Sequence, residues 1–313
     1  MLTQRMSETL SIVGAGRVGR ALGRRLHELG WRVGAVTGRS ISTARAAVRV
    51  IGAGQPVGGL THQILGSKIV LITTPDSAIE TVAKNLAVLG GKEWSGKIVL
   101  HTSGTLDSAA LQPLAKLGAA TGSMHPMQTF SHQNFPDLAK CIFGIEGSPA
   151  ALQVARKMIH QMDAVPVRLS GANKAAYHAA GSFACVYVLA LMETATRLLM
   201  TQGFKRRQAM RALLPLTRQT LNNFESVGPL AAWTGPLARG DFSTIEMHAK
   251  ALAESKPEYL EAYKTLSRLT AEELAAKPNA VLKHLESVFS AGRPSKNNER
   301  TKTKSAAAGS KID

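Results

Sequence analysis

A lysine and a histidine lie four residues apart near the start of the most apolar stretch of the sequence, in Gly171-Ala-Asn-Lys-Ala-Ala-Tyr-His178. On a helix, Lys174 and His178 project from one face, and Tyr177 shares that side in part. Burying an ammonium group is costly, so a lysine on an apolar helix needs an explanation; a cleft between two domains, open to a substrate, provides one. We expect Lys174 to give a proton to a carbonyl oxygen as hydride arrives, or to take one in reverse, and His178 to orient the substrate or relay the proton. The alternative is that Lys174 is a solvated residue of the first helical turn.

Polar residues also follow three short apolar runs that are typical of strands. The runs end in Thr73-Thr-Pro-Asp76, His101-Thr-Ser-Gly-Thr105 and Ser123-Met-His-Pro-Met127. In a doubly wound sheet, ligands bind outside the carboxyl ends of the strands. We therefore expect Thr74 and Pro75 to lie near a bound ligand, and Asp76 to cap the helix that follows.

The second and third of these strand ends carry candidate substrate ligands. Ser103 and Gly104 can offer a hydroxyl and a backbone N–H to a carboxylate or carbonyl, and His101 and His125 can contact the same ligand. Each histidine is equally compatible with a satisfied structural role. A serine–histidine hydrolytic pair is disfavoured, because the sequence has no G-x-S-x-G elbow and a nucleotide would occupy this place. We predict that Ser103 is a catalytic residue together with Lys174 and His178. His101, Gly104 and His125 are predicted to bind the substrate.

A turn-rich segment late in the chain supplies one more candidate. It reads Trp233-Thr-Gly-Pro-Leu-Ala-Arg-Gly-Asp241 and lies between predicted helices. Arg239 is predicted to offer a cation to an anionic substrate. The alternatives are that Arg239 pairs with Asp241 or that the two only fix the loop.

The first apolar run leads directly into a glycine-rich turn, in Thr9-Leu-Ser-Ile-Val-Gly-Ala-Gly-Arg-Val-Gly19. In the pattern G-x-G-x-x-G, the first glycine permits the tight turn, the second lets the backbone approach a pyrophosphate, and the third lets the helix pack against the strand. The free N–H groups and the positive end of the helix face the phosphates. Because the pattern follows a strand and opens a helix, it predicts dinucleotide binding rather than a merely structural turn. The predicted cofactor contacts are Gly14, Ala15, Gly16, Arg17, Val18 and Gly19, with Thr74 and Pro75 near the nicotinamide ribose.

The end of the second predicted strand distinguishes NAD from NADP. An acidic residue there accepts hydrogen bonds from the ribose 2′-OH, whereas an arginine favours a 2′-phosphate. The sequence reads Val36-Thr-Gly-Arg-Ser40, with Arg39 in place and no acidic residue. Ser40 and Ser42 add hydroxyl donors, so the predicted cofactor is NADP(H), bound by Arg39 and Ser40. The alternative is that Arg39 is a surface cation near a turn.

Hydrophobic patterns place these motifs on an α/β domain followed by helices. The predicted strands are residues 9–13, 32–36, 68–73, 97–101, 119–123, 141–145 and 165–168, and helical patterns such as 18–29, 77–89 and 150–161 lie between them. This alternation predicts a Rossmann doubly wound parallel sheet. After residue 170 only helical patterns follow, at 175–200, 205–223, 244–255, 257–269 and 271–285. We predict a dinucleotide-binding domain at residues 1–170, an all-α substrate and dimerisation domain at 171–291, and a disordered basic tail at 292–313.

Composition narrows the class of protein. Among 313 residues there are two cysteines, Cys141 and Cys185, outside any C-x-x-C pair, which excludes a disulfide framework and a cysteine-built zinc site and fits a reducing cytoplasm. We predict no metal site. The formal net charge of +17 comes without any RNP, zinc-finger or helix-turn-helix pattern, so we expect the basic surface to steer an anionic dinucleotide rather than to read nucleic acid.

The most apolar stretch, residues 175–192, is the one segment that raises the question of a membrane. It contains Tyr177, His178, Ser182 and Tyr187, and Glu193 follows it directly. A spanning helix needs about 20 apolar residues without such interruptions. The stretch therefore predicts a buried helix of a soluble, cytoplasmic protein that does not enter the membrane.

With these motifs in view, the chain resembles a bacterial family of Rossmann-like oxidoreductases whose C-terminal half is a domain of unknown function. The resemblance covers about residues 10–252 and is carried by the glycine turn and by four segments: His101-Thr-Ser-Gly104, Ser123-Met-His-Pro-Met-Gln-Thr-Phe130, Lys174-Ala-Ala-Tyr-His178 and Thr234-Gly-Pro-Leu-Ala-Arg-Gly-Asp241. The fold that it implies is similar to that of pyrroline-5-carboxylate reductase, ketopantoate reductase and the 3-hydroxyacid dehydrogenases.

The resemblance also has implications for the site and for assembly. In the hydroxyacid dehydrogenases, the helix that enters the second domain carries an active-site lysine and, four residues later, an asparagine; Lys174 matches the lysine, but His178 replaces the asparagine. The family often has another asparagine further along this helix, where this chain has Cys185. Relatives commonly dimerise through their helical domains, which implies a homodimer.

Two functions are compatible with these observations. The first is an NADP(H)-dependent oxidoreductase that transfers hydride to or from a small anionic carbonyl, imine or hydroxyl compound. The second is a non-catalytic NADP(H)-binding sensor or scaffold. Lys174 and His178 on one helix face favour the first. Hydride exchange with a deazaflavin, which some Rossmann relatives perform, remains a third alternative.

Overall fold

The computed structural model describes residues 9–131 and 135–291 of the chain. The chain divides into two compact units, Met1–Leu189 and Ala190–Asp313, and the described residues of each contain a hydrophobic core. The division falls inside a long helix, whereas the sequence prediction places the domain boundary at residue 170, before that helix. The basic tail predicted for residues 292–313 lies outside the described residues.

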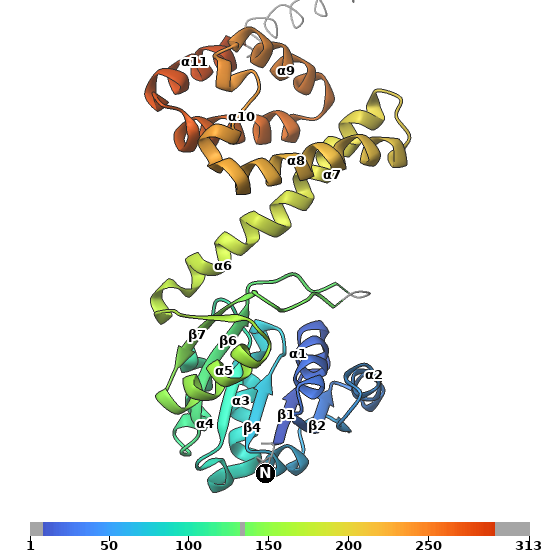
Figure 1. Ribbon diagram of the computed structural model, residues 1–313, viewed down its shortest axis with the longest axis vertical. Coiled ribbons are helices and arrows are strands. Elements are labelled where there is room, and N and C mark those ends of the chain that lie inside the picture. Colours follow the sequence, from blue (N-terminus) through green and yellow to red (C-terminus); the bar gives the residue numbers. More distant parts are fainter. Residues whose placement is uncertain (1–8, 132–134, 292–313) are drawn as a thin grey trace, which may run out of the picture. The chain divides into compact units, whose positions relative to one another are not determined.

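An eight-stranded sheet forms the centre of the first unit (Figure 1). Its strands are β1 (Thr9–Val13), β2 (Arg32–Gly38), β3 (Gln55–Gly58), β4 (Ile69–Ile72), β5 (Ile98–His101), β6 (Ala120–Pro126), β7 (Ile142–Gly147) and β8 (Val165–Arg168). They lie in the order β3-β2-β1-β4-β5-β6-β7-β8. The order reverses between β1 and β4, which is the switch point outside which doubly wound sheets bind ligands. The predicted α/β Rossmann fold is confirmed.

Two features of this sheet differ from the prediction. β7 pairs antiparallel with β6, whereas the sequence predicts parallel strands throughout. The described residues between β6 and β7 form no helix, and an antiparallel pair needs no helical crossover. The edge strand β3 was not predicted, because Gln-Pro-Val-Gly is short and carries a proline, which a sheet tolerates at its edge.

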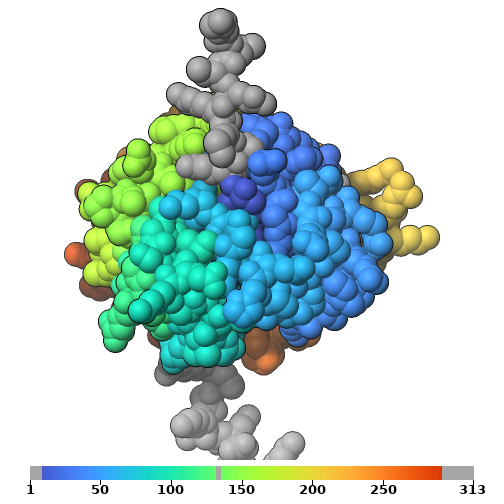
Figure 2. Space-filling model, turned by 90° about the horizontal axis from the view of Figure 1, so that it is seen from below, coloured from blue at the N-terminus to red at the C-terminus, as the bar shows by residue number. Residues whose placement is uncertain are grey.

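Helices cover both faces of the sheet. One face packs against α1 (Arg17–Glu28), α2 (Ile41–Ile51) and α5 (Pro149–Gln161). The other packs against α3 (Asp76–Gly90), α4 (Gln112–Ala115) and the 3-10 turns η1 (His62–Gly66), η2 (Gly91–Trp94) and η3 (Ser108–Leu111). β4 and β5 are therefore buried on both sides, as their unbroken apolar sequences predict. Figure 2 shows this unit from below, where segments from the start and the middle of the chain form one continuous surface.

A long helical run follows β8. It comprises η4 (Gly171–Asn173), α6 (Lys174–Ser182), a π-helical turn η5 (Phe183–Tyr187) and α7 (Val188–Thr201). The prediction that this run is buried is wrong for the chain by itself, since only 6% of its most apolar window is buried. By length and composition alone, Gly171–Thr201, with a mean hydropathy of 1.5, passes as a membrane-spanning helix. The first turn of α6, however, packs against the sheet through the fully buried Lys174. The exposed apolar surface is therefore on the later part of the run.

The second unit is helical. After α7 it contains α8 (Arg206–Ala232), η6 (Leu237–Arg239), α9 (Phe242–Ser255), α10 (Pro257–Leu274) and α11 (Pro278–Ala291). The last three helices share a core of Ile245, Ala271, Leu285 and Phe289. The sequence prediction separated the last two helices at residue 270, but the break lies before Pro278, which starts α11 at the position where proline is best tolerated.

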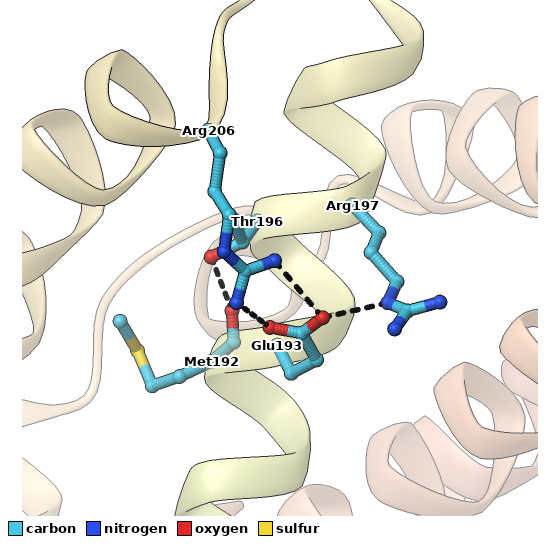
Figure 3. A network of polar contacts seen from close by, with 5 residues as sticks. All are labelled: Met192, Glu193, Thr196, Arg197 and Arg206. Atoms are coloured by element: carbon cyan, nitrogen blue, oxygen red, sulfur yellow. Dashed lines mark hydrogen bonds and ion pairs between the residues drawn. The ribbon is translucent and has the colours of Figure 1, made fainter.

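Exposed ion pairs join α7 to α8 (Figure 3). Glu193 accepts hydrogen bonds from Arg206 Nη2 at 2.6 Å and Nη1 at 3.1 Å, and from Arg197 Nε at 2.7 Å. The hydrogen bonds from Arg206, followed by that from Arg197, lower the pKa of Glu193 to about 2. Because these side chains are exposed, salt screens the interaction, and the network contributes little to the stability of the unit.

Candidate functional site

The turn between β1 and α1 has the geometry that its glycines predict. Gly14 has φ 124°, in the region that favours glycine, and its N–H donates to the Thr37 carbonyl at 3.1 Å. A Cβ on Gly14 would lie 2.8 Å from the backbone carbon of Thr73, and a Cβ on Gly19 would collide with the carbonyl oxygen of Gly14. The first and third glycines are therefore required by packing within the unit.

The middle glycine differs, because open space lies beside it. A Cβ on Gly16 would meet no atom nearer than the Thr73 carbonyl oxygen at 3.9 Å. Gly16 caps α1 without any side-chain hydrogen bond, so the first N–H groups of the helix lack a capping side chain. The Thr74 hydroxyl, at the end of β4, is buried and has no partner among the described residues. These groups fit a pyrophosphate and its ribose, which would supply the missing acceptors.

An arginine that the sequence analysis missed holds this turn. Arg20 Nε donates to the carbonyl oxygen of Ala15 at 2.8 Å. Arg20 lies one turn into α1, so its spacing of five residues from Ala15 was readable, but arginines are frequent on this helix and nothing in the sequence marked it. Arg17 is exposed at the start of the same helix and Val18 is half-buried.

Arg39 follows β2 and lies exposed beside the glycine turn. A Cβ on the preceding Gly38 would lie 3.2 Å from the Cβ of Ala15, so Arg39 starts next to the turn. Among the described residues, no carboxylate or carbonyl pairs with the Arg39 guanidinium. Ser40 instead serves as the N-cap of α2, accepting from the Thr43 N–H at 3.3 Å and contacting the Ser42 hydroxyl at 2.8 Å. The predicted contact between Ser40 and a phosphate therefore competes with an existing cap.

Asp76 corrects one prediction. The N-cap of α3 is Pro75, and Asp76 is the first helical residue with no side-chain cap bond. Its Oδ2 instead accepts hydrogen bonds from the Ser103 and Thr105 hydroxyls, both at 2.7 Å. Asp76 thus ties the end of β4 to the loop after β5, a role that depends on two strand ends meeting in space.

Ser103 is fully engaged within its own loop. Its hydroxyl donates to Asp76 and accepts from the N–H groups of Thr105 at 3.1 Å and Leu106 at 2.9 Å. One donor and two acceptor positions are all that a hydroxyl has. In this conformation, Ser103 has no hydrogen-bonding capacity left for a substrate, and its predicted catalytic role is not supported by its geometry.

His101 is buried and held in one orientation. Its Nδ1 accepts from the Ser103 N–H at 3.2 Å, which leaves the proton on Nε2 for the Asp107 carbonyl at 2.9 Å. Burial lowers the pKa of His101 to about 4. Both ring nitrogens are used, so His101 supports the loop rather than facing a ligand.

Lys174 is fully buried, which rules out the solvated alternative. Its Nζ donates to the Ser123 hydroxyl at 2.6 Å and to the Ser103 carbonyl at 3.1 Å. Burial lowers its pKa to about 8, so it still carries its proton at pH 7. Sequence reasoning missed Ser123 as a partner, although that residue ends the run that precedes His125. Lys174 joins α6 to the loop after β5 and to the middle of β6.

Two histidines flank Gly104, which is buried. A Cβ on Gly104 would collide with His178 Cδ2 and lie 2.8 Å from His125 Nε2. The two rings are 5.5 Å apart at 69°. Burial, followed by the neighbouring His178 and Lys174, lowers the pKa of His125 to about 4. The first unit thus brings Lys174, His178, Gly104 and His125 together near the carboxyl end of β5.

Arg239 belongs to the second unit. It is exposed in η6 and does not form an ion pair with Asp241 among the described residues. Asp241 instead caps α9, accepting from the Thr244 N–H at 3.1 Å. The predicted contact between Arg239 and the substrate remains a prediction.

Family models match most of the chain. A Rossmann-like domain matches residues 3–126, and a domain of unknown function, DUF2520, matches residues 141–270. No curated protein matches the sequence. The second match begins at β7, so it includes the end of the sheet as well as the helix that carries Lys174.

Solved structures with the same fold include several oxidoreductases. BF3122 of Bacteroides fragilis, a candidate NADP oxidoreductase, is 22% identical with a TM-score of 0.71, over 85% of this chain and 99% of that one. Protein TM1727 of Thermotoga maritima is 22% identical with a TM-score of 0.60, over 91% and 100%. The Plasmodium falciparum pyrroline carboxylate reductase, with NADP bound, is 12% identical with a TM-score of 0.55, over 92% and 100%. At these identities the likeness is one of fold.

Proposed function

Because this chain is a Rossmann-like protein that carries a DUF2520 domain, we propose that it is an NADP(H)-dependent oxidoreductase. Its substrate is a small anionic carbonyl, imine or hydroxyl compound. The observation that carries the proposal is the open, uncapped start of α1 at Gly16, with the unpartnered Thr74 hydroxyl beside it. A dinucleotide phosphate is the ligand whose acceptors complete such a turn.

The coenzyme, when bound, supplies hydride chemistry; the rest depends on this chain's own side chains. The uncapped amides at the start of α1 bind the pyrophosphate, and the Arg39 guanidinium, unpaired among the described residues, binds the 2′-phosphate, a charge-assisted contact that the 2′-OH of NAD cannot match. The absence of an acidic residue at the end of β2 removes the group that would favour NAD.

Lys174 is the proposed proton donor. Its pKa of about 8 keeps it protonated at pH 7 yet able to give the proton up, which suits a general acid in carbonyl reduction and a base in the reverse direction. Since the side chain is enclosed, transfer requires the ammonium to exchange one of its two hydrogen bonds for the substrate oxygen. His178, half-buried on the same helix, orients that oxygen or relays the proton.

Calorimetry on two arginine variants tests the coenzyme assignment. We expect NADP+ to bind wild type more tightly than NAD+, and Arg39→Ala to weaken NADP+ about tenfold or more while leaving NAD+ unchanged. Arg32→Ala is the matched control, because Arg32 is exposed at the opposite end of the same strand. Equal losses in both variants, or a preference for NAD+, would contradict the assignment.

The alternative is a non-catalytic NADP(H)-binding sensor or scaffold. A substrate screen with keto acids, imines and hydroxy acids, followed by nicotinamide absorbance, separates the two. We expect turnover by wild type and its loss in Lys174→Met, with nucleotide affinity retained. Turnover that survives this substitution would remove Lys174 from the mechanism, and a wild type that binds NADP(H) but turns over nothing favours the sensor.

We also propose that a second copy of this chain covers the bare apolar side chains of the helical unit. Leu216, Phe224 and Leu230 of α8 are at least 59% exposed. Exposed apolar surface on this scale marks an interaction site. Sedimentation should give a dimer for wild type and a monomer for Leu216→Asp, while Val88→Asp, on α3 of the first unit, should leave the dimer intact. A monomeric wild type would contradict the proposal.

A further inference from the structure

The loop after β5 contains a buried backbone donor, the Gly104 N–H, that the rest of the loop does not engage. Gly104 is buried, and among the described residues no group accepts a hydrogen bond from its N–H, although its neighbours Ser103 and Thr105 both donate within the loop. Buried backbone N–H groups without a partner are rare in native proteins. Gly104 also lies directly against the rings of His125 and His178, because it has no side chain to hold them away.

Tyr177 sets the orientation of His125. Its hydroxyl lies 3.2 Å from His125 Nδ1 and 3.4 Å from the His125 carbonyl oxygen. The two rings meet edge to face, 5.5 Å apart at 83°. Tyr177 can come this close because Gly144, paired with His125 across β6 and β7, leaves room: a Cβ there would lie 2.9 Å from the tyrosine ring.

The position of the tyrosine proton decides what His125 presents. If Tyr177 donates to Nδ1, the nearer and more basic of its two acceptors, the imidazole proton resides on Nε2. His125 Nε2 then becomes a second hydrogen-bond donor next to the free Gly104 N–H. In the opposite tautomer, Nδ1–H would donate to the tyrosine, and Nε2 would accept.

The charges around this loop have both signs. The buried Lys174 ammonium donates to the carbonyl of Ser103, the residue before Gly104. Three carboxylates also lie nearby and accept hydrogen bonds: Asp76 from Ser103 and Thr105, Glu146 from the N–H and hydroxyl of Ser108, and Asp107 from the Ala109 N–H. A hydrogen-bond acceptor at this place is therefore favoured by the Gly104 N–H, which has no partner among the described residues, and not by the net charge.

We propose that the Gly104 N–H and the Nε2–H of His125, oriented by Tyr177, bind a carboxylate group of the substrate. His178 forms one wall of this subsite, and Tyr177 is a positioning residue that does not touch the ligand. The inference rests on the proposed oxidoreductase function only in identifying the ligand as the substrate. It narrows that substrate to a compound with a carboxylate next to the reacting group.

Nitrogen-15 NMR of the histidine rings, with acetate as the probe, tests the subsite in the full chain. We expect His125, identified by its loss in His125→Gln, to be the Nε2–H tautomer at pH 7. Acetate should shift its signals saturably, and the neutral isostere acetamide should not. Tyr177→Phe should mix the tautomers and weaken acetate about tenfold, whereas Tyr187→Phe, on the exposed π-helical turn, should change neither.

Three results would overturn the inference: an Nδ1–H tautomer in wild type, equal shifts with acetate and acetamide, or unchanged acetate affinity in Tyr177→Phe. NADP+ calorimetry on the same samples separates this failure from failure of the proposed function. Loss of acetate binding with NADP+ affinity intact rejects only the subsite. A wild type that binds no NADP+ rejects the proposed function, while the tautomer and the acetate shifts remain readable.

Discussion

The glycine turn after β1 and the cluster around Lys174 both lie toward the carboxyl ends of the parallel strands, but they differ in how their polar groups are satisfied. At the turn, the start of α1 is uncapped and the Thr74 hydroxyl is buried without a partner. Around Lys174, the hydroxyls and carboxylates are paired with one another, whereas the Gly104 N–H and His125 Nε2 have no partner among the described residues. Hydrogen-bond donors without a partner indicate where a ligand binds, whereas donors that are already paired hold the residues of the site in position.

The largest expected effect concerns the hydrogen-bonded cluster around Lys174, and it is a change in the stability of the first unit at acidic pH. Burial lowers the pKa of His101 from 6.5 to about 4. Between these pH values the unfolded chain binds a proton that the native chain does not. The free energy of unfolding therefore decreases as the pH is lowered from 6.5 to 4, by up to roughly 3 kcal/mol. His101→Gln should flatten this part of the stability curve, measured by urea unfolding from pH 7 to pH 4. The exposed His27→Gln is the control, and identical curves for wild type and His101→Gln would show that the ring is not held neutral by burial.

The frame of the open turn comes next. Gly19→Ala should destabilise the fold by about 2 kcal/mol, because the new methyl collides with the Gly14 carbonyl oxygen and must displace backbone. Gly66→Ala, whose methyl meets open space, should leave the thermal midpoint unchanged. Similar midpoints for the two variants would mean that the turn is looser than this packing requires.

A smaller effect is expected when the buried charge is removed. Lys174→Met should change stability at pH 7 by only about 1 kcal/mol, since relief from burying an ammonium offsets two lost hydrogen bonds. Because burial lowers the pKa of Lys174 from 10.5 to about 8, the unfolded chain holds that proton up to higher pH than the native one. Wild type should therefore gain stability relative to Lys174→Met as pH rises above 8. A variant several kcal/mol less stable at pH 7 would make Lys174 primarily structural.

The smallest effect is expected at the exposed pairs of the second unit. Carbon-13 NMR should find the Glu193 carboxyl titrating near pH 2, and Arg206→Gln should raise that pKa toward its usual value. One-molar salt should raise it in the same direction, because exposed charges are screened. An unchanged pKa in either case would show that Arg206 is not its main partner.

Local patterns were the part of the molecule that the sequence predicted well. The glycine turn, Arg39 and most strands follow from residues adjacent in the chain, so their positions could be read directly. The antiparallel β7 and the edge strand β3 could not, because pairing depends on which connection carries a helix and which strand lies at the edge.

Roles that depend on several strand ends meeting were beyond the sequence. The sequence indicated a helix cap at Asp76 and a free hydroxyl at Ser103, but the ends of β4 and β5 place the two side chains within hydrogen-bonding distance of each other. Ser123 carried no signal of its own, since a serine at a strand end is common. The apolar run 175–192 predicted a buried helix, but only 6% of its most apolar window is buried among the described residues, because an apolar sequence does not say which surface covers it.

The most direct test of the account uses Gly16. Among the described residues, its added methyl would make only an ordinary contact, with the Thr73 carbonyl oxygen at 3.9 Å, but it would stand where a phosphate approaches the backbone. Calorimetric titration with NADP+ should find a dissociation constant at least roughly a hundredfold weaker for Gly16→Ala than for wild type, equivalent to about 2.7 kcal/mol, with the thermal midpoint unchanged. Equal affinity in the two proteins, or no heat of binding in wild type, would contradict the claim that this open turn is the coenzyme site.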